Sequence, residues 1–132
     1  MSTFLRENAM GNKILIIDDD HDILETTGSI LGYEGFEIHS ADSVERGIEL
    51  LEKISPDILL LDIMFPESKT RGFEAAREIK TRFPHLPIIV LSAINREYAF
   101  DFTKEDIKAD EFLNKPVRTK TLIEHIRRLI AK

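Results

Sequence analysis

Between Pro56 and Pro66 the sequence reads PDILLLDIMFP, with four consecutive apolar residues, Ile58–Leu61, at its centre. An apolar run this short, bounded by prolines, is typical of a strand that is buried on both faces, as in a parallel sheet. Asp62 follows at the carboxyl end of the predicted strand. Ligands of open α/β sheets bind outside this end of the strands, so Asp62 is a candidate site residue. A solvated aspartate that opens a turn explains the residue equally well at this point.

The segments on either side repeat the pattern of a short apolar run with a polar end. They predict four further strands, over residues 13–17, 36–40, 88–91 and 111–113. The first of them, Lys13–Ile17, is rich in β-branched residues and ends in three consecutive aspartates, Asp18, Asp19 and Asp20. The strand at 36–40 alternates in character, which favours a place near the edge of the sheet.

Helices are predicted after the strands, because apolar residues there recur at the helical period. Asp20 is the predicted cap of the first helix, and Asp42 takes the cap position of a capping box before the second. A third helix is predicted over about 72–83, a weakly patterned fourth over 95–108 and a fifth over 119–131. The residues expected to face inward are Ile23, Thr27, Ile30, Leu31, Val44, Ile48, Leu51, Ala76, Ile79, Phe83, Leu122, Ile126, Leu129 and Ile130.

The whole chain has the size and composition of one globular domain. Its 132 residues suffice for a single well-buried core. A net charge of -6 argues against broad attraction to nucleic acid or to an anionic membrane. The sequence has no cysteine, which excludes thiolate metal sites, and no apolar run near the ~20 residues of a membrane span. We therefore expect a cytoplasmic protein without direct contact to nucleic acid or membrane. Strands that alternate with helices predict an α/β fold with a parallel sheet.

Polar side chains stand at the carboxyl ends of four predicted strands, namely Asp18 with Asp19, then Asp62, Ser92 and Lys115. In a doubly wound sheet these ends share one edge and can converge. Two carboxylates ~4 Å apart repel each other by about 4 kcal/mol at an effective dielectric constant near 20. A hard divalent cation removes that penalty, and oxygen ligands suit Mg²⁺. A lysine and a hydroxyl opposite the carboxylates suit a phosphoryl group, so the set predicts a carboxylate nucleophile for phosphoryl transfer.

The ordered set of motifs resembles the response-regulator receiver domain of two-component signalling, over about residues 13–130. The motifs are Asp18-Asp19, Asp62 with Pro66 four residues later, Ser92-Ala93 and Lys115-Pro116. The resemblance implies a flavodoxin-like, doubly wound, five-stranded parallel sheet in the order 2-1-3-4-5, with five helices of which the fourth is atypical. Residues 1–12 have no clear pattern and are expected to form an N-terminal tail, and the resemblance makes residues 13–132 a single receiver domain.

The resemblance also assigns roles around a bound Mg²⁺ cofactor. It implies that Asp62 accepts a phosphoryl group from a sensor histidine kinase or a phosphotransfer protein. Asp19 would bind Mg²⁺ directly and Asp18 mainly through water, with Asp62 and the backbone carbonyl of Met64 as further ligands. A protein of this kind is not a classical enzyme, although it assists its own phosphorylation and dephosphorylation.

Three further residues take roles in binding the phosphoryl group and in the switch. Ser92 would bind a phosphoryl oxygen, and Lys115, preceding Pro116 through a cis bond, would pair with the phosphoryl group. Ser92 and Phe112 are the implied switch residues. The downstream partner is expected to be an unknown protein or a second copy of the chain in a homodimer. Because aromatic residues two positions apart cannot all face inward on a helix, we expect the partner surface to contain Tyr98 or Phe100.

Two alternatives remain open at the level of sequence. One is a receiver-like interaction module that works without phosphorylation, which is consistent with a loop after Pro66 about two residues longer than the usual spacing. The other is a phosphohydrolase of the haloacid-dehalogenase type, with Asp18 as nucleophile, Asp20 as acid/base, and Ser92 and Lys115 as later motifs. The second alternative leaves Asp62 without a role.

Overall fold

The computed structural model describes residues 12–62, 71–92 and 109–131, and in these ranges the sheet has the predicted order. Five parallel strands are arranged as β2-β1-β3-β4-β5. They are β1 (Lys13–Ile17), β2 (Glu37–Ala41), β3 (Ile58–Asp62), β4 (Ile88–Ser92) and β5 (Glu111–Asn114). Each boundary lies within one residue of the prediction, because the apolar runs that define the strands are short and sharply bounded.

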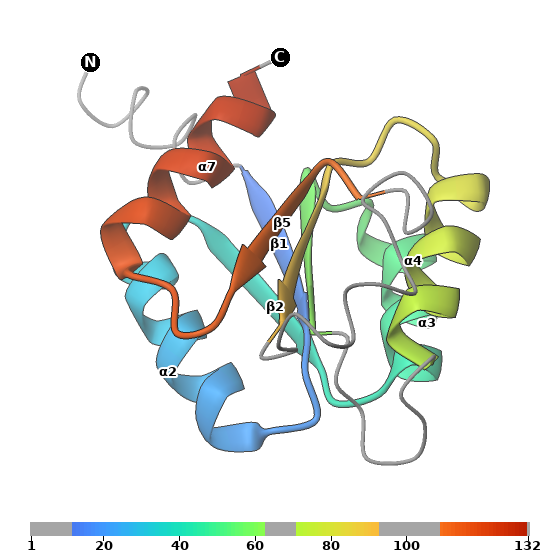
Figure 1. The fold of residues 1–132 in the computed structure, drawn as a ribbon, viewed down its shortest axis with the longest axis horizontal. Helices are drawn as coiled ribbons and strands as arrows, with labels where there is room; N and C mark the ends of the chain where they lie inside the picture. Colours follow the sequence, from blue (N-terminus) through green and yellow to red (C-terminus); the bar gives the residue numbers. More distant parts are fainter. Residues whose placement is uncertain (1–11, 63–70, 93–108, 132) are drawn as a thin grey trace.

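Four helices cover the sheet in the described ranges, two on each face (Figure 1). Helices α2 (His21–Tyr33) and α7 (Thr119–Ala131) lie on one face, and α3 (Val44–Ile54) and α4 (Arg71–Arg82) on the other. The predicted fourth helix, over 95–108, lies entirely outside the described residues. None of the helices described combines the length and the apolar character that a membrane-spanning helix requires.

Alternate residues of each strand enter two separate apolar cores. Leu15, Ile17, Leu59 and Leu61 pack toward α3 and α4, together with Ala75, Ala76 and Ile79. Ile14, Ile16, Ile58 and Leu60 pack toward α2 and α7, together with Leu31, Leu122 and Ile126. Because successive strand side chains point to opposite faces, a strand buried on both sides has apolar residues at every position. The apolar runs at 14–17 and 58–61 are therefore consequences of a two-faced sheet.

Two predictions about the helices are wrong in detail. Ser43, and not Asp42, caps α3, and its hydroxyl accepts a hydrogen bond from the Arg46 backbone N–H. Ile30 is 37% exposed, because α2 contacts the sheet along a stripe through Leu24 and Leu31 that Ile30 lies beside. The cap of α2 is confirmed: the Asp20 carboxylate accepts hydrogen bonds from the first turn.

A lysine and an aspartate fix the position of α4 relative to the starts of two strands. Lys80 Nζ donates to the Leu86 carbonyl at 2.7 Å and to Asp110 Oδ2 at 2.8 Å. The same Asp110 oxygen accepts the Ile88 backbone N–H at 2.8 Å. Since Ile88 begins β4 and Asp110 precedes β5, this contact holds the amino ends of both strands. The opposite ends of these strands, which carry Ser92 and Asn114, are thereby kept in register.

Candidate functional site

Three aspartates meet at the carboxyl edge of the sheet. The register of β1 and β3 pairs Ile17 with Leu61, so that Asp18 and Asp62 follow side by side. Asp18 is 2% exposed and Asp62 4% exposed. One carboxylate oxygen from each of Asp18, Asp19 and Asp62 lies within 4.8 Å of the other two. The fold thus brings Asp18 and Asp19 together with Asp62, which lies 44 positions after Asp18 in the sequence.

Lys115 supplies a positive charge to this acidic cluster from the end of β5. Its Nζ lies 3.4 Å from Asp18 Oδ2 and 3.4 Å from Asp62 Oδ2, and its side chain is 22% exposed. The peptide bond to Pro116 is cis, as the sequence resemblance implies. Among the side chains that the structure describes, one ammonium group stands here against three carboxylates, an excess of negative charge that favours a bound cation.

The remaining predicted site residues are placed only in part. Ser92 is the last residue of β4 and pairs in register with Asn114, the neighbour of Lys115. Phe112 pairs in register with Val90 and packs, partly buried, against the core on the α3 and α4 side. Met64 lies outside the described residues, as do Tyr98 and Phe100 of the predicted partner surface.

The donor set of the acidic cluster fits Mg²⁺. Magnesium binds oxygen ligands at 2.0–2.1 Å, so two oxygens on opposite sides of the ion stand about 4.2 Å apart. Adjacent oxygens of the octahedral ion stand about 2.9 Å apart, so the three carboxylate oxygens, which lie within 4.8 Å of one another, must move closer together to bind one ion. The cluster contains neither sulfur nor imidazole, the ligands that select softer metals. Asp18, Asp19 and Asp62 can therefore hold a magnesium ion.

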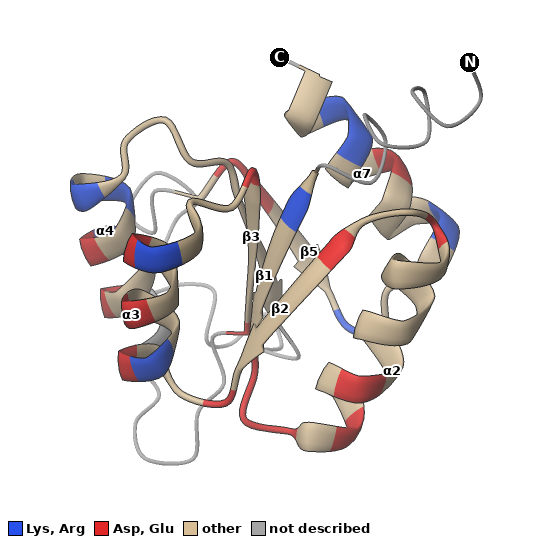
Figure 2. Cartoon of the chain, turned by 180° about the vertical axis from the view of Figure 1, so that it is seen from behind, with Lys and Arg blue, Asp and Glu red and all other residues tan. Residues whose placement is uncertain are grey.

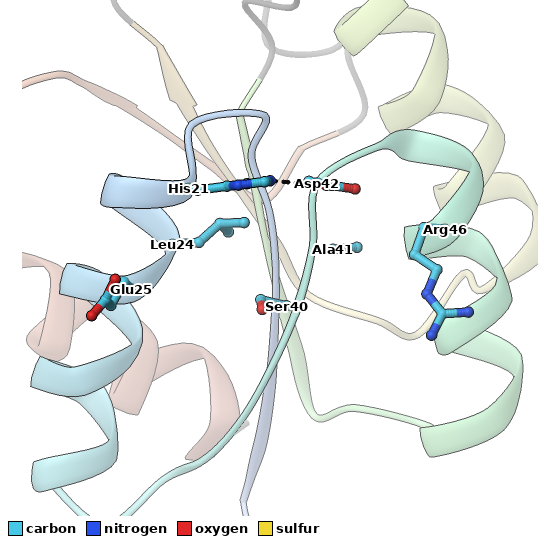
Figure 3. A pocket seen from close by; sticks show the side chains of 7 residues that line it. All are labelled: His21, Leu24, Glu25, Ser40, Ala41, Asp42 and Arg46. Atoms are coloured by element: carbon cyan, nitrogen blue, oxygen red, sulfur yellow. Dashed lines mark hydrogen bonds and ion pairs between the residues drawn. The ribbon is translucent and has the colours of Figure 1, made fainter.

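The pairing of His21 with Asp42 beside the cluster was not predicted from the sequence. His21 Nε2 lies 2.9 Å from Asp42 Oδ2 and donates to it, joining the start of α2 to the end of β2 (Figure 3). The hydrogen bond to Asp42 raises the pKa of His21 from its ordinary value of 6.5. The same bond lowers the pKa of Asp42 below its ordinary value of 3.8. No local spacing links positions 21 and 42, and only the strand register brings them together.

The pKa shifts of this pair predict where it contributes to stability. The contribution of His21 is present below pH 6.5 and is lost as pH rises through its raised pKa. The contribution of Asp42 is present above pH 3.8 and is lost as pH falls through its lowered pKa. We expect Asp42→Asn to lower the His21 midpoint in an NMR titration. We also expect it to lower protein stability most between these limits. An unchanged His21 midpoint would contradict the contact.

The pair spans a shallow groove between α2 and α3 with a volume of about 410 Å³ (Figure 3). The groove is lined by His21, Leu24, Glu25, Ser40, Ala41, Asp42 and Arg46. Figure 2 shows that the chain leaving β1 toward α2 and the first turn of α2 are both acidic. The groove lies at the carboxyl end of the edge strand β2, because Ser40 and Ala41 are the last residues of that strand.

The comparison with known families and structures decides what kind of domain this is. Residues 14–127 match the family model of the response regulator receiver domain. The chain belongs to this family. A CheY-like receiver domain protein from Methanospirillum hungatei JF-1 has 28% sequence identity and a TM-score of 0.81. The aligned region covers 91% of this chain and 94% of that protein.

Two further solved structures support the same relationship. A receiver domain protein from Clostridium thermocellum is 32% identical, with a TM-score of 0.78 and coverage of 91% of this chain and 94% of that one. The response regulator TrrA from Thermotoga maritima, solved in complex with Mg²⁺ and BeF, is 30% identical with a TM-score of 0.77. That alignment covers 89% of this chain and 98% of TrrA.

Membership of the family settles the general class of the protein. Receiver domains are signalling domains and not classical enzymes, and they interact with histidine kinases or phosphotransfer proteins. The flavodoxin-like fold and the strand order expected from the sequence are confirmed.

The haloacid-dehalogenase alternative is not supported, because the Asp20 carboxylate accepts the backbone N–H groups of Asp22 and Ile23. Asp20 is accordingly absent from the cluster of three aspartates in the described chain.

Proposed function

We propose that this receiver domain accepts a phosphoryl group on Asp62 from a histidine kinase or a phosphotransfer protein, in the presence of Mg²⁺. The observation that carries the proposal is the position of the Asp62 carboxylate. It is buried at the end of the central strand β3, within 4.8 Å of two further carboxylates and 3.4 Å from the Lys115 ammonium group. Charged groups of both signs are thus gathered around one potential nucleophile.

In the proposed reaction a carboxylate oxygen of Asp62 attacks the phosphorus of a phosphohistidine. The new P–O bond forms as the P–N bond breaks, and the imidazole leaves with the electron pair of that bond. Bound Mg²⁺ would neutralise charge that develops on the phosphoryl oxygens. Asp18 and Asp19 would hold the ion beside Asp62. Lys115 would face the same phosphoryl group, because its Nζ already lies beside Asp62 Oδ2.

Ser92 and Phe112 would carry the change in charge at Asp62 to the surface. Ser92 ends the strand next to β3 and is proposed to bind a phosphoryl oxygen. Phe112 lies on the neighbouring strand β5, opposite Val90, only two residues before Asn114, the partner of Ser92. A displacement of Ser92 at the end of β4 would therefore be transmitted to Phe112 through the pairing of β4 with β5. An unknown downstream protein would read the changed surface.

Acetyl phosphate with Mg²⁺ provides the direct test. We expect the wild-type protein to gain one phosphoryl group in an intact-mass measurement and to lose this uptake in EDTA. Asp62→Asn should abolish the uptake. Asp57→Asn, the same change at an exposed aspartate just before the amino end of β3, is the matched control and should leave it unchanged. In the phosphorylated sample the NMR signals of the Phe112 ring should shift.

Two outcomes would overturn the proposal. Equal uptake by Asp62→Asn would show that another residue is the acceptor. No uptake by the wild-type protein from acetyl phosphate or from a phosphorylated kinase would favour the alternative of a module that works without phosphorylation.

A further inference from the structure

Two consecutive residues at the end of β2 hold both ends of the acidic turn that follows β1. The Asp18 backbone N–H donates to the Ala41 carbonyl at 3.1 Å. The His21 ring, three residues later, pairs with the carboxylate of Asp42, the residue after Ala41, at 2.9 Å. Figure 3 shows the His21 and Asp42 side chains pointing toward each other across the groove between α2 and α3. The turn 18–21 is therefore held at its beginning by Ala41, the last residue of the edge strand, and at its end by Asp42, the residue that follows it.

Hydrogen bonds within the turn make its shape depend on these two ends. The Asp20 backbone N–H donates to Asp18 Oδ1 at 2.9 Å, which leaves Asp18 Oδ2 to face Lys115. The Asp20 carboxylate accepts the N–H groups of Asp22 and Ile23 at 2.9 and 3.2 Å and so joins the turn to α2. Asp19 lies between these fixed points and belongs to neither strand nor helix. Its direction is thus set by the relative position of β1, β2 and the first turn of α2.

We propose that Asp42, acting through His21, is a positioning residue for the metal site, and that it holds the turn in the shape that turns Asp19 toward Asp18 and Asp62. The inference rests on the proposed Mg²⁺ site. Asp42 itself is not one of the cluster carboxylates. When the contact is lost, the first residue of α2 loses its hydrogen bond to the residue that follows β2. The binding of an ion must then order the turn, and that ordering lowers the affinity.

The exposure of the pair limits the size of the effect. The side chain of His21 is 76% exposed and that of Asp42 54% exposed. Exposed ion pairs contribute little to stability, and the same coupling energy expressed as affinity is about two- to fivefold. A plain surface ion pair without influence on the metal site predicts no change in Mg²⁺ affinity. Measured binding of the ion therefore separates the two possibilities.

The strand that precedes Asp42 offers a matched control. His39 Nε2 lies 2.6 Å from Glu37 Oε2, so β2 carries a second histidine–carboxylate pair. That pair is placed at the amino half of the strand, away from the acidic turn. Glu37→Ala removes a contact of the same chemistry as Asp42→Ala. If loss of any surface pair on β2 weakened the site, the two variants would behave alike.

The test is a Mg²⁺ titration of the full chain by isothermal calorimetry, with wild type, Asp42→Ala, His21→Ala, the double variant, Asp42→Asn and Glu37→Ala. We expect Asp42→Ala and His21→Ala each to weaken Mg²⁺ binding two- to fivefold, and the double variant to be no weaker than either. Asp42→Asn, whose amide oxygen still accepts the His21 N–H, should keep most of the affinity. Glu37→Ala should bind as wild type does.

The outcomes that overturn the inference differ from those that overturn the proposed function. Wild-type affinity in Asp42→Ala would remove the positioning role and leave the metal site in place. Additive losses in the double variant, or equal losses in Asp42→Asn and Asp42→Ala, would show a charge effect and not a hydrogen-bonded tie. If the wild-type protein binds no Mg²⁺, the metal site fails, and the positioning role fails with it.

Discussion

Gly47→Ala is expected to destabilise the protein by roughly 1–2 kcal/mol, although alanine is the better helix former. A Cβ atom at Gly47 would lie 2.2 Å from Ile17 Cδ1 and 2.7 Å from Ile17 Cγ1. Ile17 is fully buried at the end of β1, so it cannot move aside freely. Overpacking of a core costs about 1–3 kcal/mol, and the helical preference for alanine offsets up to about 1 kcal/mol of that.

Gly32→Ala is the matched control for this prediction. A Cβ at Gly32 would lie 3.8 Å from Ile38 Cγ1, an ordinary contact, and the position is exposed near the end of α2. We expect this variant to gain roughly 0.5 kcal/mol. Urea unfolding followed by circular dichroism would give both values, from the shift of the midpoint at an unchanged slope. Equal midpoints for the two variants would show that Ile17 yields to the added methyl group without cost.

The displacement of Ile17 connects this prediction to the site. Asp18 follows Ile17 directly, and a shifted Ile17 side chain strains the end of β1. Ile17→Val removes the nearest methyl group, at a cost of about 0.5–1.5 kcal/mol by itself. In the Gly47→Ala background we expect Ile17→Val to cost less than it does alone, because it relieves part of the overlap.

The sequence predicts the sheet well because the sheet imposes local patterns. A strand buried on both faces requires an uninterrupted apolar run, and the runs at Ile14–Ile17 and Ile58–Leu61 end where polar residues begin. The convergence of Asp18 and Asp62 was predictable for the same reason. Parallel strands that begin together also end together, so their first polar residues share an edge.

The contacts that sequence reasoning missed depend on distances between elements. The cap of α3 was placed at Asp42 although Ser43 stands next to it, because either residue type caps helices well. Ser43 caps the helix in the structure, while the Asp42 carboxylate accepts a hydrogen bond from His21 of α2. Ile30 fits the helical period but lies beside the contact stripe of α2. The width of that stripe depends on how the helix packs, which a single period does not specify.

Lys115→Met is expected to destabilise the metal-free protein by about 2–3 kcal/mol. Lys115 Nζ lies 3.4 Å from both Asp18 and Asp62, whose carboxylates are almost completely buried. Removal of one partner from a fully buried ion pair costs about 3–5 kcal/mol, and the partial exposure of Lys115 reduces this value. Methionine preserves most of the length and apolar surface of lysine. The loss of stability in Lys115→Met therefore measures the effect of the missing charge and not a change in packing.

Saturating Mg²⁺ should reverse most of this destabilisation, because the ion supplies positive charge to the same carboxylates. Folding and ion binding are linked in a thermodynamic cycle. If Lys115→Met is less stable than the wild type without Mg²⁺ but equally stable with it, the variant must bind the ion more tightly by the same free energy. A difference of about 2 kcal/mol corresponds to roughly 30-fold tighter Mg²⁺ binding by Lys115→Met. Urea unfolding in EDTA and in Mg²⁺, together with calorimetric titration, measures both sides of this equality.

The phosphoryl uptake of the same variant should change in the opposite direction. If Lys115 faces the phosphoryl group, as we propose, Lys115→Met binds Mg²⁺ more tightly and yet is phosphorylated more slowly by acetyl phosphate. Lys120→Met is the control, because Lys120 is exposed in the first turn of α7, and it should change neither quantity. A variant that loses the same stability with and without Mg²⁺ would show that Lys115 acts through packing. If Lys115→Met binds Mg²⁺ more tightly and takes up phosphate more slowly, Lys115 has two roles. It competes with the ion for Asp18 and Asp62 before the reaction, and it stabilises the phosphoryl group together with the ion during the reaction.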